Sequence, residues 1–177
     1  KRYATSKFQF GPIDLQLKAG EITGVVGQNG HGKTTLLRMV AGDLLADAGQ
    51  LAYPAFGQTG QHVNWSRVKR EVAYVPQELP RWRGSLAENL SFEAAMHGLR
   101  GEDNERAVRL MVERLDLAEH LDKRWDSLAG GFKLRFALAR ALITQPRLLV
   151  MDEPLANLDQ KARGLLLRDV HDLARSY

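Results

Sequence analysis

Residues 27–35 read GQNGHGKTT, and this nonapeptide limits what the chain can fold into more than any other stretch does. It fits the pattern G-x-x-x-x-G-K-[ST] completely, through Gly27, Gly32, Lys33 and Thr34. Glycines at these positions let the backbone form a nest whose N–H groups point inward at phosphate oxygens. The pattern therefore predicts a phosphate site, with Lys33 on the β- and γ-phosphates and the Thr34 hydroxyl on Mg²⁺.

The sequence on either side predicts a strand that enters the loop and a helix that leaves it. Residues 21–26 (EITGVV) indicate a buried strand, and residues 35–41 (TLLRMVA) indicate a helix that ends at Gly42. A strand, a glycine loop and a helix N-terminus together form an anion site. The nucleotide-binding residues predicted from the loop are Gly27, Asn29, Gly30, Gly32, Lys33, Thr34 and Thr35. An incidental glycine-rich turn would leave this order of elements unexplained.

The composition of the chain excludes several classes of site and partner. Cysteine is absent, which excludes disulfides and thiolate metal sites, and no apolar run approaches the ~18 residues that cross a bilayer. The net charge of +4 is mild and the basic residues are dispersed. We therefore expect no direct contact with nucleic acid.

The patterns along the chain predict one α/β domain in three parts. Residues 1–76 are interpreted as a β-rich nucleotide-binding part, residues 77–142 as a helical subdomain, and residues 143–177 as the return to the core. The first residue is not methionine, and helical spacing continues to the last residues. We therefore expect a piece of a longer protein, truncated at both ends.

Four further segments carry predictions about strands. Alternating apolar residues over 8–20 predict short antiparallel strands, and the sequence over 43–70 predicts hairpins and turns. Residues 71–76 predict a strand that ends at Pro76. The continuous apolar run 148–151 predicts a central parallel strand covered on both faces.

Two carboxylates follow that run directly. Asp152 and Glu153 stand at the C-terminal end of a predicted strand, where open α/β sheets bind their ligands. Asp152 is predicted to hold Mg²⁺ through a water molecule, and Glu153 to polarise the water that attacks the γ-phosphate. An ordinary pair of solvated acids is the alternative, and the phosphate loop upstream favours the catalytic interpretation.

A second glycine segment precedes the acidic pair. Residues 127–135 read SLAGGFKLR and resemble the LSGGQ signature of ATP-binding-cassette (ABC) ATPases, and the resemblance to that family covers nearly the whole chain. It implies a P-loop NTPase (RecA-like) core with an N-terminal antiparallel β subdomain and an inserted α-helical subdomain. It also implies ATP and Mg²⁺ as cofactors.

The signature implies a dimer. Two glycines open a helix there, so bare N–H groups and the positive dipole end can face a γ-phosphate. In the family that phosphate belongs to the other subunit, and two ATP molecules are sandwiched in a head-to-tail dimer, which can be a homodimer or a heterodimer. The resemblance therefore adds Ala129, Gly130 and Gly131 to the nucleotide site.

Three more residues are implied by the resemblance alone. Gln77 resembles the Q-loop glutamine, which contacts Mg²⁺ and the attacking water and couples to a transmembrane partner. Residues 155–159 (LANLD) resemble the D-loop that closes with Asp159. Tyr3 resembles the A-loop aromatic that stacks on adenine, with Phe8 and Phe10 as competitors.

The sequence departs from the family pattern at three places. Ala129 replaces a serine whose hydroxyl hydrogen-bonds the γ-phosphate, and Phe132 replaces a glutamine at the dimer seam. We therefore expect a weakened signature that keeps its backbone donors. The histidine switch of the family follows a further strand, and His171 lies in the helix before it, so His171 is not assigned that role.

Most ABC domains power transporters, so the resemblance implies an ATPase subunit that drives transport of a substrate across a membrane. It would act with a transmembrane subunit or a fused membrane domain, in the cytoplasm at the inner face of the cell membrane. A soluble ABC ATPase that acts on a ribosome, DNA or a regulatory partner is the first alternative. A nucleotide-binding scaffold in which Glu153 is idle is the second.

One stretch bears on the type of transporter. Residues 85–99 resemble the segment after the Q-loop in exporter-type ATPases, which faces the membrane partner. Pro80, Trp82 and Trp65 are candidate apolar anchors for that contact, and a core position for one of these tryptophans is the alternative.

Overall fold

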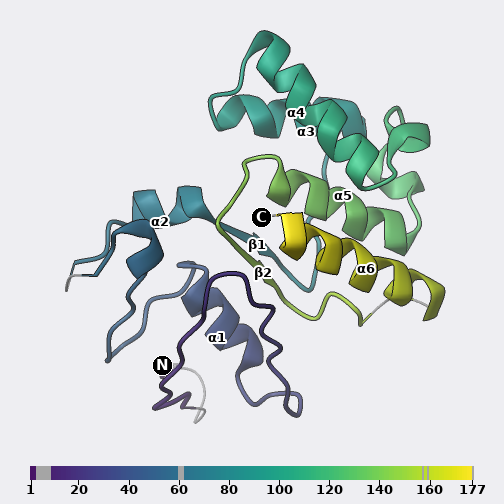
Figure 1. Ribbon diagram of the computed structural model, residues 1–177. Coiled ribbons are helices and arrows are strands. Elements are labelled where there is room, and N and C mark those ends of the chain that lie inside the picture. The colour runs from purple at the N-terminus through teal and green to yellow at the C-terminus, as the bar shows by residue number, and fades with distance from the viewer. Residues whose placement is uncertain (3–8, 60–61, 157, 159, 177) are drawn as a thin grey trace.

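The computed structural model describes residues 1–2, 9–59, 62–156, 158 and 160–176. Helices and short helical turns predominate (Figure 1). The elements in chain order are α1 (Lys33–Val40), η1 (Pro54–Phe56), α2 (Trp65–Glu71), β1 (Val72–Val75), α3 (Leu86–Met96), α4 (Gly101–Arg114), η2 (Ala118–His120), η3 (Trp125–Ser127), α5 (Gly130–Leu142), β2 (Leu148–Met151) and α6 (Gln160–Ser176).

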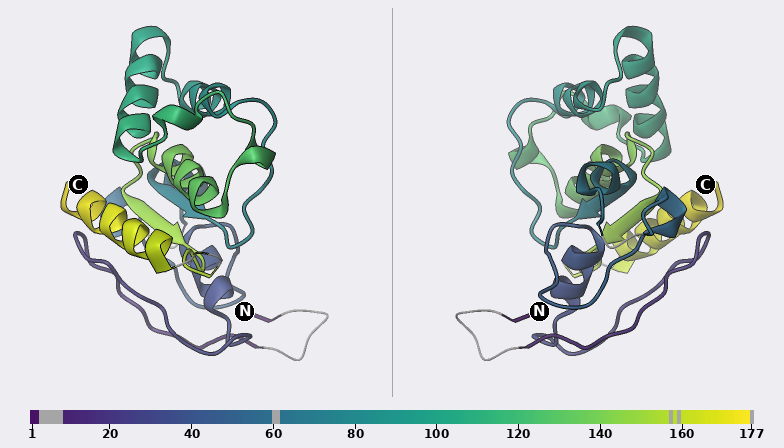
Figure 2. Two further views of the ribbon diagram at one scale, coloured as in Figure 1. Left: turned by 90° about the vertical axis from the view of Figure 1, so that its right-hand side faces the viewer. Right: turned by 90° about the vertical axis from the view of Figure 1, so that its left-hand side faces the viewer.

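Two parallel strands connect the parts of the chain. β1 pairs with β2 in the register Val72 to Leu148 through Val75 to Met151. The helical segment between them is the crossover that parallel strands require. Helix α5 packs on β1 and α1 contacts β2, so the strands lie between helices (Figures 1 and 2). The strands predicted at 71–76 and 148–151 are confirmed, although Glu71 belongs to the preceding helix.

The main core lies in the helical segment. Helix α3 starts at Ser85, whose side chain accepts from the Glu88 N–H while the Glu88 carboxylate accepts from the Ser85 N–H. This capping box satisfies backbone donors that a helix start leaves unpaired. The side chains that are almost completely buried in this core are Leu86, Leu90, Met111, Leu115, Leu117, Phe136, Leu138 and Ile143. They confirm the helical periodicity expected over residues 77–142.

Residues 43–59 and 62–70 contain the expected turns but no hairpin strands. The expectation of hairpins was wrong: these described residues contain η1 and α2, with one isolated bridge between Tyr53 and Gln58. The Asn64 side chain caps α2 by accepting from the Arg67 N–H at 3.1 Å. Tyr53 stacks on Phe56 at 5.6 Å between ring centroids, so the aromatic residues pack a small second core.

Residues 9–32 do not form the predicted strands. This segment contains no strand in the described structure, and only an isolated bridge joins Arg2 to Gln9. Figure 2 shows this segment as a long extended loop whose chain direction reverses near residues 19–20. Within the expected buried strand, Ile22 is 61% and Val26 93% exposed. A segment with an alternating or apolar pattern forms a strand only where a neighbouring strand completes its hydrogen bonds. In the described structure no strand is paired with residues 9–32.

No helix in the described part of the chain has the length and apolarity that crossing a bilayer requires.

Candidate nucleotide-binding site

The loop before α1 has the backbone that its glycines permit. Gly30 has φ 81° and Gly32 has φ 89°, both in the left-handed region. A Cβ at Gly30 would meet open space, so its backbone conformation rather than crowding favours glycine. The chain can thus turn sharply enough to present its N–H groups on one side.

The N-terminus of helix α1 follows the glycine loop directly. Gly32 is its N-cap residue and provides no side-chain cap, and no acidic residue stands in the first turn. The first N–H groups of a helix have no partner within the helix, and the helix dipole is positive there. This end of α1 is therefore suited to an anion such as a phosphate.

Lys33 crosses the loop and is held by three acceptors. Its Nζ donates to the Gly27 carbonyl oxygen at 2.9 Å, the Gln28 carbonyl oxygen at 3.1 Å and Asn29 Oδ1 at 3.5 Å. The same Nζ lies 3.8 Å from Glu153 Oε1. The side chain of Lys33 is 17% exposed, so its charge is concentrated within the loop.

Gln77 and Glu153 meet although 75 residues separate them in the sequence. The Gln77 amide donates from Nε2 to Glu153 Oε2 at 2.9 Å. The two residues follow β1 and β2, and parallel neighbouring strands end at the same edge of a sheet. Glu153 has φ 46°, a conformation that costs a residue with a side chain about 1–2 kcal/mol. Such strain is frequent at functional sites.

These residues line one hollow of about 390 Å³. Its lining consists of Asn29, Gly30, Gly32, Lys33, Thr34, Thr35, Gln77 and Glu153. The structure thus brings most of the predicted loop residues to the two predicted strand-end residues. The loop contributes a cation and N–H donors, and the strand ends contribute an amide and a carboxylate.

Asp152 lies directly beside this hollow and is only 2% exposed. Its Oδ2 accepts a hydrogen bond from the Tyr74 hydroxyl at 3.2 Å. Its Oδ1 has no hydrogen-bond partner among the described residues. The pKa of Tyr74 is raised to about 12, mainly by burial and secondly by the charge of Asp152. The hydroxyl therefore keeps its proton and donates it to Asp152 in a hydrogen bond.

Sequence reasoning missed Tyr74. The hydroxyl of Tyr74 stands out in an otherwise apolar strand. The sequence alone, however, does not show which strand lies beside β1. The sequence also did not show that Lys33 and Glu153 approach each other. Both contacts depend on the order and register of the strands.

The donor set fits Mg²⁺. No group of three or more His, Cys, Asp or Glu residues in the described parts of the chain is placed to hold a metal ion. Mg²⁺ bound with a nucleotide needs only one or two carboxylates, because phosphates and water supply the other oxygen ligands. Asp152 Oδ1, buried and without a partner, and Thr34, which lines the hollow, match that requirement.

The signature segment lies outside the hollow. Ala129 and Gly130 are exposed, and Ala129 is the N-cap residue of α5 without a side-chain cap. The open helix end that the sequence predicted is therefore present. Phe132 packs inward on its own domain: its ring stacks on His120 at 3.8 Å between centroids, with 22° between the planes.

Two predicted site residues, Tyr3 and Asp159, lie outside the described residues, as does Phe8. Adenine stacking and the D-loop contact therefore stay predictions.

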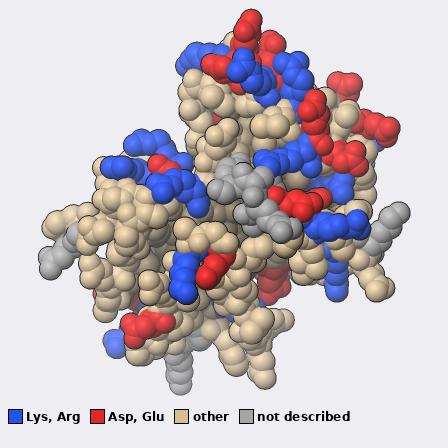
Figure 3. All heavy atoms as spheres, viewed as in Figure 1, with Lys and Arg blue, Asp and Glu red and all other residues tan. Residues whose placement is uncertain are grey.

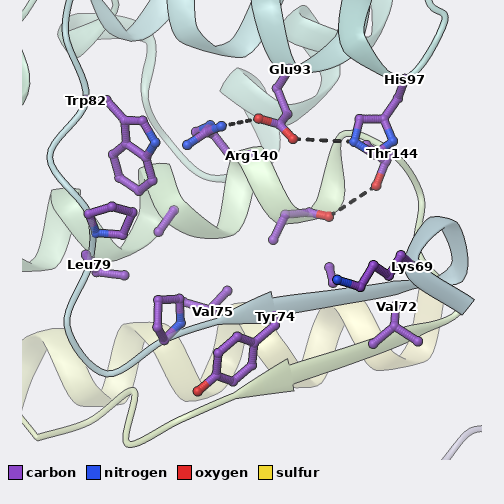
Figure 4. Close-up of a pocket in the computed structure, with 15 residues that line it drawn as sticks. Lys69, Val72, Tyr74, Val75, Leu79, Trp82, Glu93, His97, Arg140 and Thr144 are labelled. Atoms are coloured by element: carbon purple, nitrogen blue, oxygen red, sulfur yellow. Dashed lines mark hydrogen bonds and ion pairs between the residues drawn. The ribbon is translucent and has the colours of Figure 1, made fainter. Parts of the chain in front are cut away.

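A second hollow, of about 290 Å³, lies between β1 and the helices α3 and α5 (Figure 4). Pro80 and Trp82 line it, and Trp82 also packs against the main core, with its ring centroid 4.5 Å from that of Trp125. Trp65 packs in the second core. The Arg140 guanidinium lies 4.5 Å from the centre of the Trp82 ring and forms an ion pair with Glu93. We refer to this hollow as the groove.

The sequence of this chain is similar to those of known ATP-binding proteins. A family described as "ABC transporter" matches residues 10–156. The sulfate/thiosulfate import ATP-binding protein CysA of Vibrio cholerae is 39% identical over 171 residues, which are 91% of this chain and 44% of that protein. The Fe(3+) ions import ATP-binding protein FbpC of Pasteurella multocida is 34% identical over 166 residues, which are 91% of this chain and 45% of that protein.

A solved structure is similar over almost the whole chain. CbiO1 from Clostridium perfringens, described as part of the ABC transporter complex cbiONQ, has a TM-score of 0.87 at 23% identity. The similarity covers 99% of this chain and 71% of that chain, and at this identity it shows the fold. The chain spans less than half the length of the two import proteins.

Proposed function

Since this chain belongs to the ABC transporter family, we propose that it binds and hydrolyses ATP to power an importer. The observation that carries the proposal is the single hollow in which the phosphate loop, Lys33, Gln77 and Glu153 meet. A phosphate loop alone binds nucleotide, whereas hydrolysis also needs a carboxylate beside the γ-phosphate. Here the carboxylate of Glu153 already lies 3.8 Å from the Nζ of Lys33.

The residues in the hollow, together with Asp152, have separate roles in the proposed hydrolysis. The N–H groups of the loop and of the α1 N-terminus bind the phosphates, and Lys33 exchanges its loop carbonyls for β- and γ-phosphate oxygens. Thr34, Asp152 and Gln77 would hold Mg²⁺, which supplies positive charge to the phosphates when bound. Glu153 accepts the proton of the attacking water, and the Gln77 amide orients its carboxylate.

We extend the proposal to a head-to-tail dimer. The exposed N-terminus of α5, with Ala129, Gly130 and Gly131, lies outside the hollow of its own chain. In the dimer it would face the γ-phosphate held by a second ABC domain. The inward stacking of Phe132 on His120 supports this arrangement, because it leaves the backbone donors at the helix start uncovered.

The variant Ala129→Ser is expected to strengthen ATP-dependent dimerisation. A serine hydroxyl would add one hydrogen bond to a charged phosphate, worth about 1.5–3 kcal/mol, so the dimer affinity should rise about tenfold or more. Sedimentation of the intact protein with ATP, on a Glu153→Gln background that retains the nucleotide, measures this change. Ala118→Ser, at another exposed alanine, is the matched control. An unchanged dimer affinity would refute the role assigned to position 129.

We propose that the groove receives a transmembrane partner, in the cytoplasm at the inner membrane face. Pro80 and Trp82 supply apolar surface beside Arg140 and Glu93, and tryptophan and arginine are both enriched at interfaces. The names of the relatives favour an import system over the exporter type that residues 85–99 suggested.

Replacing Trp82 with alanine is expected to release the protein from the membrane. Large aromatic anchors commonly contribute 2 kcal/mol or more to an interface, so the fraction bound to partner-containing membranes should fall about tenfold or more. Co-fractionation of the intact protein measures this. Trp65→Ala is the control, because Trp65 is also half-buried and also packs against a core, but does not line the groove. ATP binding is measured in both variants to show that the fold persists, and equal retention of both on membranes would contradict the proposal.

Co-fractionation also separates transport from the soluble alternative. On the face drawn in Figure 3, basic and acidic side chains are interspersed rather than gathered into one basic patch. This distribution favours a membrane-protein partner over DNA or a ribosome. If the intact protein sedimented with ribosomes or bound DNA instead of membranes, the soluble alternative would replace the transport proposal.

A further inference from the structure

Tyr74 and Asp152 lie on the same face of the two strands. Tyr74 in β1 pairs with Val150 in β2, and residues two apart on a strand point to the same face. Asp152 continues the line of β2, because its N–H donates to the Val75 carbonyl oxygen at 2.9 Å. Asp152 is therefore the diagonal neighbour of Tyr74 across the strand pair.

The reach of a tyrosine suits this diagonal. Two residues of a parallel strand advance by about 6.6 Å, and diagonal neighbours across a strand pair are within reach of aromatic side chains. The Tyr74 hydroxyl accordingly lies 3.2 Å from Asp152 Oδ2. In Figure 4 the Tyr74 ring points away from Trp82, Glu93 and His97, so its hydroxyl turns away from the helices that line the groove.

The two oxygens of the Asp152 carboxylate have different environments. Oδ2 accepts the Tyr74 hydrogen bond, whereas Oδ1 is buried and has no partner among the described residues. A carboxylate rotates easily about its last bond, so a single hydrogen bond can decide which oxygen faces a given direction. A buried acceptor without a partner is costly and points to a ligand that is bound there in the working protein.

We propose that Tyr74 is a positioning residue of the ATP site, an inference that rests on the proposed function. Its hydroxyl holds Asp152 Oδ2 and thereby aims Oδ1 at a water molecule bound to Mg²⁺. Tyr74 does not line the hollow, and it acts through Asp152. Packing alone would be served equally well by phenylalanine, so removing the hydroxyl separates positioning from packing.

The test is the Mg²⁺ dependence of nucleotide binding in Tyr74→Phe. Binding of a fluorescent ATP analogue to the intact protein is titrated with Mg²⁺, starting from a metal-free solution. The variant should bind the metal-free analogue with unchanged affinity, but the Mg²⁺ concentration for half-maximal tightening should rise about tenfold. Electron paramagnetic resonance of Mn²⁺ in the nucleotide complex gives a second readout, in which the variant should release more free Mn²⁺.

Tyr53→Phe is the matched control. Tyr53 also donates a part-buried hydrogen bond from its hydroxyl, to the Val40 carbonyl oxygen at 2.9 Å, but it lies outside the hollow. This variant should lower the melting temperature without moving the Mg²⁺ midpoint. A Tyr74→Phe protein with an unchanged midpoint would overturn the inference, whatever its melting temperature. Tyr74→Met, which also lacks the hydroxyl, replaces it if the phenylalanine variant does not fold.

The wild-type titration tests the proposed function separately. If nucleotide binding by the wild type were independent of Mg²⁺, the hydrolysis proposal itself would fail. If the wild type responds and Tyr74→Phe responds identically, only the role of Tyr74 fails.

Discussion

Glu153→Gln is expected to lower the rate of ATP hydrolysis by the intact protein about 10²–10⁴-fold while ATP binding persists. A positioned general base contributes a factor of this size, and an amide cannot accept the proton of the attacking water. Glutamine has nearly the same shape, and its carbonyl oxygen can still accept from the Gln77 amide. The variant therefore keeps the hydrogen bond to Gln77 but loses the basic carboxylate.

Phosphate release at saturating ATP measures the rate, and a fluorescent ATP analogue measures the affinity. Glu113→Gln is the control, because Glu113 is exposed on α4 and lies outside the hollow. The removal of the charge beside Lys33 predicts that the affinity for ATP stays equal or rises, since Glu153 no longer competes with phosphate for that cation. Unchanged hydrolysis would show that Glu153 is idle and would favour the nucleotide-binding scaffold.

The second large effect concerns Lys33→Ala, for which we expect ATP affinity to fall by about 100-fold or more. The Nζ of Lys33 would make charge-assisted hydrogen bonds to two phosphate groups, each worth about 1.5–3 kcal/mol. Four acceptors or charges surround it in the structure, so the cation is held in the loop before the nucleotide arrives. Alanine removes both the charge and this preorganisation.

Equilibrium binding of the fluorescent ATP analogue checks this result, and adenosine separates the phosphate contribution from that of the base. Lys18→Ala serves as the control, because Lys18 is an exposed lysine that forms an ion pair with Glu21 and lies outside the hollow. The melting temperature of Lys33→Ala should stay within a few degrees of the wild type, since Lys33 belongs to neither of the two described hydrophobic cores. An ATP affinity within threefold of the wild type would contradict the site.

Local patterns predicted the helices and the paired strands well. Met111 and Leu115 are buried within the segment that was expected to be helical, and residues 148–151 form a strand because a continuous apolar run suits a position between helices. The same reasoning failed for residues 21–26, whose apolar pattern has no paired strand. A helix completes its hydrogen bonds within itself, whereas a strand depends on a second segment that the local sequence does not name.

Residue types and their spacing predict which chemical groups the site contains. The glycines that adopt left-handed backbone, the lysine and threonine beside them, and the acidic pair after an apolar run can each be recognised in this way. Which of these groups meet depends on the tertiary structure. The parallel register of β1 and β2 brings Gln77 to Glu153 and Tyr74 to Asp152, and leaves one oxygen of Asp152 free among the described residues. Residue types fix what a side chain can donate or accept, but strand order and register fix its partner, because those contacts join residues more than 70 positions apart.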